Sequence, residues 1–330
     1  MRKTSFATTL CLSLALIIGT SLQAESKLLS AYISDSPSSS VPAWIAKDAG
    51  LFKKYGLDVD LVFIDGSTRG IQSLLAGDLS FTEAVGTSAI NGRIAGGDIA
   101  IVNGVVNTLP YYIVGKGNIK SREDLKGRTA AVHIPGTAAD FALRLALKQV
   151  GIPYNQIKAI TVGGGPARIA SVIAGQTDFT IVSDAEKIQG ERNGLKVVID
   201  MAALKVPFLY TCTVTSRQMI REQPNAVQRM VEAIAAGVQF FKANKEESIK
   251  IMNKYTRGAN REILEGAYSA YSQLFVEDTY PTLEGLRNTL EVQSSWDPKA
   301  GKAKAEDFVD LRFVDRLRSS GFIDKLYGRK

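Results

Sequence analysis

Short apolar segments alternate with amphipathic segments along most of the chain, and this alternation limits the folds that the sequence can adopt. Apolar runs of four to eight residues fit strands, and the segments between them carry apolar residues at helical spacing. We expect strands at residues 27–32, 57–64, 80–84, 99–106, 113–115, 129–133, 159–162, 179–183 and 208–214, and helices at 42–49, 69–76, 89–95, 138–150 and 167–174. This pattern predicts an α/β protein with parallel-rich sheets and helices on both faces of each sheet.

A weak internal repeat supports a division into two lobes. Ile71–Gly77, followed by Phe81, resembles Ile169–Gly175, followed by Phe179, and each copy comes after a glycine turn. The repeat fits a duplication, although any strand–turn–helix–turn–strand unit would look similar. We expect a first lobe made of residues 25–109 and 215–330, a second lobe made of residues 110–214, and two hinge crossings at 108–110 and 213–215.

From about residue 224 onward the pattern is helical. Apolar residues recur on one helix face at Val227, Met230, Val231, Ile234 and Val238. Further helical patterns cover residues 263–274, 283–292 and 308–317. We expect these helices to pack on the first lobe.

The first 24 residues have the order of a secretory signal peptide. Arg2 and Lys3 precede an apolar stretch at residues 10–18, and small residues lead to Ala24. A membrane anchor is the alternative, but spanning hydrocarbon takes about 20 apolar residues, and this stretch is about half as long. We expect cleavage after Ala24, a mature chain beginning at Glu25, and a periplasmic location.

Composition excludes several classes of function. Without residues 1–24, Cys212 is the only thiol, so no internal disulfide can form, and its strand-like surroundings indicate a buried, unreactive side chain. A single histidine and a single cysteine give no material for a metal site of these ligands, and we expect no metal and no cofactor. The net charge of +7 is not clustered as nucleic-acid binding requires, and it mildly favours anionic ligands. We expect a monomer.

Four turns carry the strongest indications of a binding site. Each lies where the carboxyl end of a strand leads into the amino end of a helix, a place where free N–H groups and hydroxyls bind anions. N-capping alone would also explain a single Ser or Thr at such a position. The turns are Ser38–Ser40, Gly66–Thr68, Gly86–Ser88 and Pro135–Thr137.

Several single residues are further candidates. His133 lies beside a turn, and without a catalytic partner motif it is interpreted as a hydrogen-bonding pocket wall. Arg69 and Arg168 stand near two helix starts, and the sequence does not decide which of them pairs with an anion. The full set of expected ligand-binding residues is Ser39, Ser40, Trp44, Ser67, Thr68, Gly86, Thr87, Ser88, Tyr111, His133, Gly136, Thr137, Arg168, Ser183 and Asp184.

Several of these segments resemble a known family. Residues 42–59, which read PAWIAKDAGLFKKYGLDV, together with segments 74–78, 124–127 and 165–175, resemble the nitrate/sulfonate/taurine (NMT1/THI5-like, SsuA-like) solute-binding proteins of ABC transporters. The resemblance implies a two-lobed type II periplasmic-binding fold, a ligand cleft between the lobes, a permease partner at the membrane, and pocket residues from the turns above. It implies capture of a small anionic organic solute, such as a sulfonate, taurine or a carboxylate, and no enzyme activity.

Two alternatives stay open at this point. One is a pyrimidine-binding protein for a thiamine precursor, or a related biosynthetic enzyme. A single histidine, the absence of a cysteine cluster and the secretion signal count against the enzyme. The other alternative is a secreted sensor that binds its ligand and docks on a membrane receptor.

Overall fold

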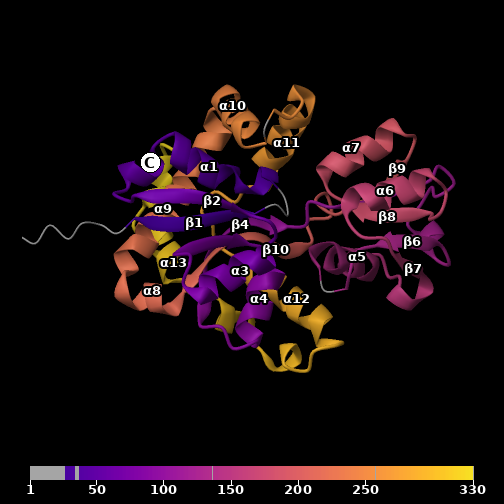
Figure 1. The fold of residues 1–330 in the computed structure, drawn as a ribbon, viewed down its shortest axis with the longest axis horizontal. Helices are drawn as coiled ribbons and strands as arrows, with labels where there is room; N and C mark the ends of the chain where they lie inside the picture. The colour runs from indigo at the N-terminus through magenta and orange to yellow at the C-terminus, as the bar shows by residue number, and fades with distance from the viewer. Residues whose placement is uncertain (1–26, 34–36, 136, 257, 330) are drawn as a thin grey trace, which may run out of the picture.

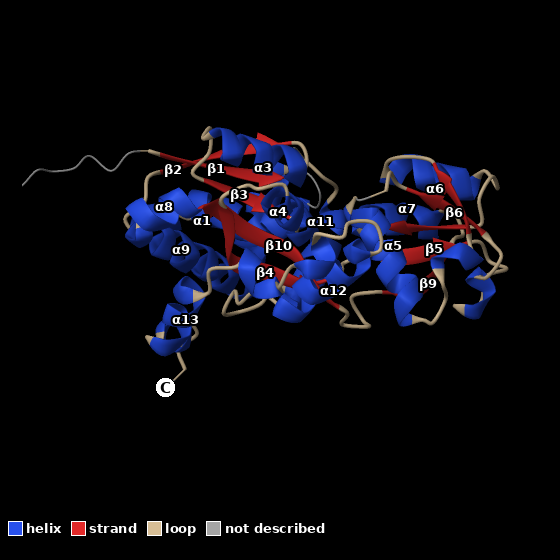
Figure 2. Ribbon diagram, turned by 90° about the horizontal axis from the view of Figure 1, so that it is seen from below, coloured by secondary structure: helices blue, strands red, loops and turns tan. Residues whose placement is uncertain are grey.

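The computed structural model describes residues 27–33, 37–135, 137–256 and 258–329 and contains two mixed sheets of five strands each (Figures 1 and 2). The first sheet has the order β2 (Val59–Ile64), β1 (Leu28–Ile33), β3 (Phe81–Ala84), β10 (Pro207–Ser216) and β4 (Ile99–Thr108). The second has the order β7 (Lys158–Thr161), β6 (Thr129–Val132), β8 (Phe179–Val182), β5 (Tyr112–Gly115) and β9 (Lys196–Asp200). We call the parts built on these sheets lobe 1 and lobe 2.

Both lobes have the same arrangement of strands. In lobe 1, β1 pairs in parallel with β2 and β3, and β10 runs antiparallel between β3 and β4. In lobe 2, β6 pairs in parallel with β7 and β8, and β5 runs antiparallel between β8 and β9. The repeated sequence segments occupy equivalent places, since each forms the helix and the strand that precede the antiparallel strand of its sheet.

Helices cover both faces of each sheet. Lobe 2 contains α5 (Ala138–Gln149), α6 (Gly165–Ile173) and α7 (Asp184–Arg192), with short 3₁₀ turns at Glu123–Leu125 and Tyr154–Gln156. Lobe 1 contains the 3₁₀ turn η1 (Pro37–Ser40), α1 (Val41–Asp48), α2 (Leu51–Lys54), α3 (Ser67–Ala76), α4 (Gly86–Ile94), α8 (Arg217–Glu222), α9 (Pro224–Ala243), α10 (Lys245–Tyr255), α11 (Arg261–Leu274), α12 (Leu283–Ser294), 3₁₀ turns at Ala300–Lys302 and Ala305–Phe308, α13 (Arg312–Ser319) and α14 (Phe322–Leu326).

The carboxyl-terminal helices pack on lobe 1, as the sequence indicated. One face of the first sheet carries α1 and α9, which approach so closely that a Cβ on Gly237 would lie 2.3 Å from the carbonyl oxygen of Pro42. The other face carries α3, α4 and α12. The helix expected at 308–317 begins only at Arg312, because Val309 forms a parallel bridge with Ile101 and the N–H of Asp310 donates to the Ile101 carbonyl.

Two extended segments connect the lobes, and one of them differs from expectation. The chain passes from β4 to β5 through residues 109–111 and returns from β9 to β10 through residues 201–206. The expected return at 213–215 is wrong, because these residues lie inside β10 and pair with β3 and β4, so residues 207–214 belong to lobe 1. The two connections lie side by side, since Thr108 Oγ1 donates to the Val206 carbonyl at 3.0 Å and the Met201 N–H donates to the Tyr111 carbonyl at 3.0 Å.

Strand directions fix which edges of the two sheets face each other. β4 leads out of lobe 1, and it runs parallel to β1, β2 and β3 because β10 is antiparallel to both of its neighbours. By the same reasoning β9, which leads out of lobe 2, runs parallel to β6, β7 and β8. The carboxyl ends of the parallel strands in each lobe therefore point toward the other lobe.

Side chains also touch across the two lobes, between α5 and α12 and between α7 and α11, two helix pairs that lie on opposite sides of the connections in Figure 1. Phe141 of α5 packs edge-on against Trp296, which follows α12, with 5.4 Å between ring centroids. Lys148 of α5 pairs with Glu291 of α12 at 2.5 Å. On the α7 side, the guanidinium of Arg192 pairs with Glu262 of α11 at 2.8 Å.

Candidate ligand-binding site

The turns singled out in the sequence lie at the facing carboxyl edges. In lobe 1, η1, α3 and α4 follow β1, β2 and β3, and in lobe 2, α5, α6 and α7 follow β6, β7 and β8. In open α/β sheets this edge is the usual place for a ligand. We therefore describe the side chains of each edge in turn.

On the lobe 1 edge, most of the expected hydroxyls are buried. Ser39 and Ser40 lie in η1 and are almost fully inaccessible, and Ser40 Oγ has no hydrogen-bond partner. Ser67 is also buried, and its Oγ accepts a 3.0 Å hydrogen bond from the N–H of Val85, which ties the start of α3 to the start of α4. Thr68, one residue further along, is exposed.

The first turn of α4 is held tightly against β10. A Cβ on Gly86 would lie 2.7 Å from the Leu209 carbonyl oxygen, so only glycine permits this approach. Thr87 is buried, whereas Ser88 is half-buried. The backbone of this turn is thus fixed at the edge that faces lobe 2.

The sequence reasoning missed a buried acid behind these turns. Glu83 of β3 is 4% exposed, one of its carboxylate oxygens has no hydrogen-bond partner, and burial raises its pKa to about 8. The nearby Ser40 hydroxyl opposes this rise, although it makes no hydrogen bond of normal geometry. No motif marks Glu83, and only its place in a short strand between the apolar residues Phe81 and Val85 could have indicated it.

Glu83 shares a polar stripe with the neighbouring strands. Thr213 of β10 pairs directly with Glu83 on one side and with Asn103 of β4 on the other. Asn103 Oδ1 accepts from the Thr213 N–H at 2.9 Å, while its Nδ2 is buried without a partner. Directly opposed residues in antiparallel strands share a face, so this stripe crosses three strands of lobe 1.

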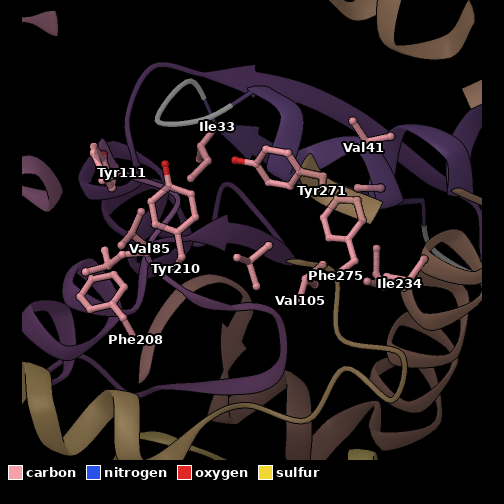
Figure 3. Packing of buried hydrophobic residues seen from close by; sticks show 14 of the residues in the cluster. Ile33, Val41, Val85, Val105, Tyr111, Phe208, Tyr210, Ile234, Tyr271 and Phe275 are labelled. Carbon is pink, nitrogen blue, oxygen red and sulfur yellow. The ribbon is translucent and has the colours of Figure 1, made fainter. Parts of the chain in front are cut away.

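Two of the expected aromatic residues have different places, since Trp44 lies in the core of lobe 1 and Tyr111 lies in the first connection between the lobes. Trp44 is stacked on Tyr255, with centroids 4.8 Å apart, and is buried within the core. Tyr111, in the first connection, packs edge-on against Tyr210 of β10 with centroids 5.8 Å apart. In Figure 3 the hydroxyl ends of Tyr210 and Tyr271 appear on either side of Ile33, the last residue of β1.

On the lobe 2 edge, Arg168 is the central group. It is 3% exposed, and its guanidinium donates to the carbonyl oxygens of Gly163 at 2.5 Å and Ile181 at 3.0 Å. Its Nε is buried and makes no hydrogen bond. Burial lowers the pKa of Arg168, while Tyr111 and Glu186 act in the opposite direction, and an arginine remains charged at neutral pH under such shifts.

The two arginines near helix starts have different environments. Arg69 is exposed and pairs with Asp65 at 3.4 Å. Arg168 is one residue further along its helix relative to the repeated segment, because Ile169 corresponds to Ile71. One residue rotates a side chain by about 100° around a helix, which turns Arg168 toward the sheet and Arg69 toward solvent.

His133 lies within the electrostatic reach of Arg168. Burial and the positive charge of Arg168 both lower the pKa of His133, so the imidazole is neutral at pH 7. Its Nδ1 accepts a 2.8 Å hydrogen bond from the Ile134 N–H, which places the ring proton on Nε2. His133 therefore offers a hydrogen-bond donor beside a buried cation.

Two of the remaining candidates of lobe 2, Thr137 and Ser183, are helix N-caps. Thr137 caps α5: its hydroxyl donates to the Ile134 carbonyl at 2.8 Å and accepts from the Asp140 N–H. Ser183 caps α7, with both its N–H and its hydroxyl donating to Glu186. Gly136 lies outside the described residues, and Asp184 begins α7.

The cavities of the described residues do not coincide with the expected site. Cavities of about 250 to 750 Å³ open on lobe 1, for example beside Leu57 and Arg229, and none of the expected residues lines these cavities. Among the described residues, no group of three His, Cys, Asp or Glu side chains could hold a metal ion. In the same residues, no helix has the length and apolar character needed to cross a bilayer.

Cys212 agrees with its expected environment. The thiol is fully buried, donates to the Ala84 carbonyl at 3.2 Å, and has its pKa raised by burial. A thiol in this state is not a nucleophile. The prediction of a buried side chain is confirmed.

Two facing sheets of this order, with ligand-type turns at their facing edges, define the fold of the periplasmic binding proteins. The aliphatic sulphonate binding protein SsuA of Escherichia coli matches with a TM-score of 0.70 and 18% identity, over 87% of this chain and 91% of that one. The alkanesulfonate-binding protein SsuA of Xanthomonas axonopodis pv. citri, solved with bound MOPS, matches with a TM-score of 0.62 and 16% identity, over 84% and 95% of the two chains.

Sequence comparison then identifies the family. The NMT1/THI5 like family model matches residues 38–248, so the chain belongs to this family. A protein of Brucella abortus described as a binding protein is 29% identical over 233 residues, which cover 68% of this chain and 70% of the relative. The expected family and fold are therefore confirmed.

Proposed function

We propose that this protein is the solute-binding component of an ABC importer. It captures a small anionic organic solute between its lobes, outside the cytoplasm, and delivers it to membrane permease subunits. The family, the binding-protein fold and the sulfonate-binding names of fold neighbours support this assignment.

Arg168 is the observation that carries the proposal. A buried guanidinium with an unpartnered Nε–H lies at the carboxyl edge of the lobe 2 sheet, the edge where ligands bind in such sheets. A buried unsatisfied donor is unfavourable, and an anion placed there removes the penalty. Sulfonate and carboxylate groups both accept hydrogen bonds from guanidinium and imidazole donors.

The other groups of the two edges complete the proposed pocket. The His133 Nε2–H lies beside Arg168, and Tyr111 connects this group to Tyr210 of lobe 1. The backbone of the turn at Gly86–Ser88 and the hydroxyls of Ser39 and Ser40 supply donors from lobe 1. We propose that these two sets of donors meet on the ligand when the lobes close, with the φ/ψ changes absorbed in residues 109–111 and 201–206.

Calorimetric titration of the mature chain with ethanesulfonate, butyrate and nitrate tests the proposal. We expect one site per chain for at least one of these anions. Because a hydrogen bond to a charged group contributes about 1.5 to 3 kcal/mol, Arg168→Met should weaken binding ten- to a hundredfold or more. Arg69→Met is the matched control and should change affinity by less than about twofold, since Arg69 is exposed.

Two results would overturn the proposal. The first is equal affinity of wild type and Arg168→Met for the anion that binds. The second is the absence of binding for every anion of the panel. Because Arg168 also holds two carbonyl groups, Arg168→Lys is measured alongside, as it keeps the charge, and thermal melts confirm that each variant is folded.

A further inference from the structure

The lobe 1 edge contains a group that an anion does not explain. Glu83 is a carboxyl with an unpartnered buried oxygen, and the adjacent Ser40 hydroxyl is buried without a partner as well. An ionised carboxylate has no donor to offer an anion, so in its ionised form Glu83 fits a cationic group instead.

A series of neighbouring residues connects Arg168 in lobe 2 with Glu83 in lobe 1. Arg168 interacts electrostatically with Tyr111, and Tyr111 packs on Tyr210 at 5.8 Å. Tyr210 is two residues before Cys212 on β10, which corresponds to about 7 Å along a strand, and Cys212 pairs directly with Ala84, the residue after Glu83 on β3. A short molecule that bridges the lobes along this path would have one end at each group.

Among the residues that the structure describes, no cation acts on Glu83. Its strongest influences are burial and Ser40, and the neighbours across the sheet are Thr213 and Asn103, which are neutral. The Cys212 thiol, which is within electrostatic reach, is neutral too. An ionised Glu83 therefore needs a positive charge from outside the described chain.

We propose that Glu83, with Ser40, is a specificity residue that binds a primary ammonium group of the ligand, so that the solute is a small zwitterion with its acid group on Arg168. This inference rests on the proposed function and narrows it. An ammonium offers three donors, which match the free oxygens of Glu83 and Ser40. The charges of Glu83 and Arg168 are then both paired by one net-neutral molecule.

Binding of such a ligand should release a proton. With a pKa of about 8, Glu83 is about nine-tenths protonated at pH 7 in the free protein. A neighbouring ammonium favours the carboxylate, so the proton leaves to the buffer when the ligand binds. A ligand that lacks the amine would leave Glu83 protonated and release no proton from it.

The test compares matched pairs of ligands by calorimetry at pH 7. The pairs are 2-aminoethanesulfonate with 2-hydroxyethanesulfonate, and 4-aminobutyrate with butyrate, each titrated in two buffers of different ionisation enthalpy. For at least one pair we expect at least tenfold tighter binding of the amine, with release of close to one proton. Glu83→Gln, which resembles the protonated acid and should fold, should abolish both the preference and the proton release while changing the affinity for the amine-free partner less than threefold.

Glu232→Gln is the control, because it removes a carboxyl of α9 that accepts a hydrogen bond from the Gln228 amide. It should keep the preference and the proton release. Equal affinity for both members of each pair, or an amine preference that persists in Glu83→Gln, would overturn the inference and leave the proposed function intact. Failure of all four compounds to bind would instead contradict the proposed function.

Discussion

Glu83 should make the stability of the protein depend on pH. Its pKa is about 8 in the folded chain and near 4.5 when unfolded, so the folded state binds more protons between these values. The contribution of Glu83 to the free energy of unfolding should therefore be highest below about pH 4.5. It should fall as the pH rises toward 8, by up to about 1.4 kcal/mol per pH unit.

Urea denaturation at pH 5.5 and pH 8 measures this effect. Wild type should lose more stability over the interval than Glu83→Gln, which cannot ionise. Identical pH dependence of the two proteins would show that Glu83 is ionised in the folded state or is not buried as described.

At the level of helices, two glycines allow opposite predictions. A Cβ at Gly237 of α9 would lie 2.3 Å from the backbone oxygen of Pro42, and α1 cannot move away without opening the core. Gly237→Ala should therefore lower the free energy of unfolding by about 1 to 3 kcal/mol. Gly266 of α11 has no atom within 4 Å of the same position, so Gly266→Ala should raise stability by about 0.5 to 1 kcal/mol. Equal shifts in the denaturation midpoints would contradict this reading of the packing.

The contact between α5 and the end of α12 should restrain the lobes. The Phe141 and Trp296 rings pack together, and the Arg144 guanidinium lies 5.3 Å from the Trp296 ring. Trp296→Ala should broaden the distribution of interlobe distances in spin-label measurements without ligand. Leu75→Ala, which truncates an exposed apolar side chain on α3, should leave the distribution unchanged. A Trp296→Ala distribution as narrow as that of wild type would show that this contact does not hold the lobes.

The elements could be predicted well where periodicity and turn chemistry agree. The strands and helices of the repeated units lie within about three residues of expectation, because apolar spacing is a local property. The strand Lys196–Asp200 was not among the expected elements, although it contains the short apolar run Val197–Ile199. The return crossing was misplaced because β10 is a single apolar run, and only pairing with β3 and β4 assigns it to lobe 1.

The candidate site was less predictable for a physical reason. Turns at strand ends are visible in sequence, but the orientation of a side chain within a helix turn is not, so Arg69 and Arg168 looked equivalent. Trp44 looked like a pocket wall and lies in the core, and Glu83 carried no motif at all. Which polar groups lack partners is a property of the folded packing.

At the scale of the whole molecule, the account requires the two lobes to move. Paired connections, facing carboxyl edges and unpartnered groups in both lobes all favour a ligand that is held from two sides at once. A ligand shifts the lobes toward closure only through contacts made in the closed state. Spin labels on the two lobes can report this motion, because the buried Cys212 thiol does not compete for the reagent.

The most direct test is the distance between labels at Gln72→Cys on α3 and Glu191→Cys on α7, which are exposed residues of lobe 1 and lobe 2. Double electron–electron resonance is recorded without ligand and with the tightest-binding anion of the titration panel at saturation. The account predicts a shorter mean distance and a narrower distribution with ligand, and no such change in Arg168→Met at the same ligand concentration. An unchanged distance distribution in the saturated wild-type protein would contradict capture between the lobes.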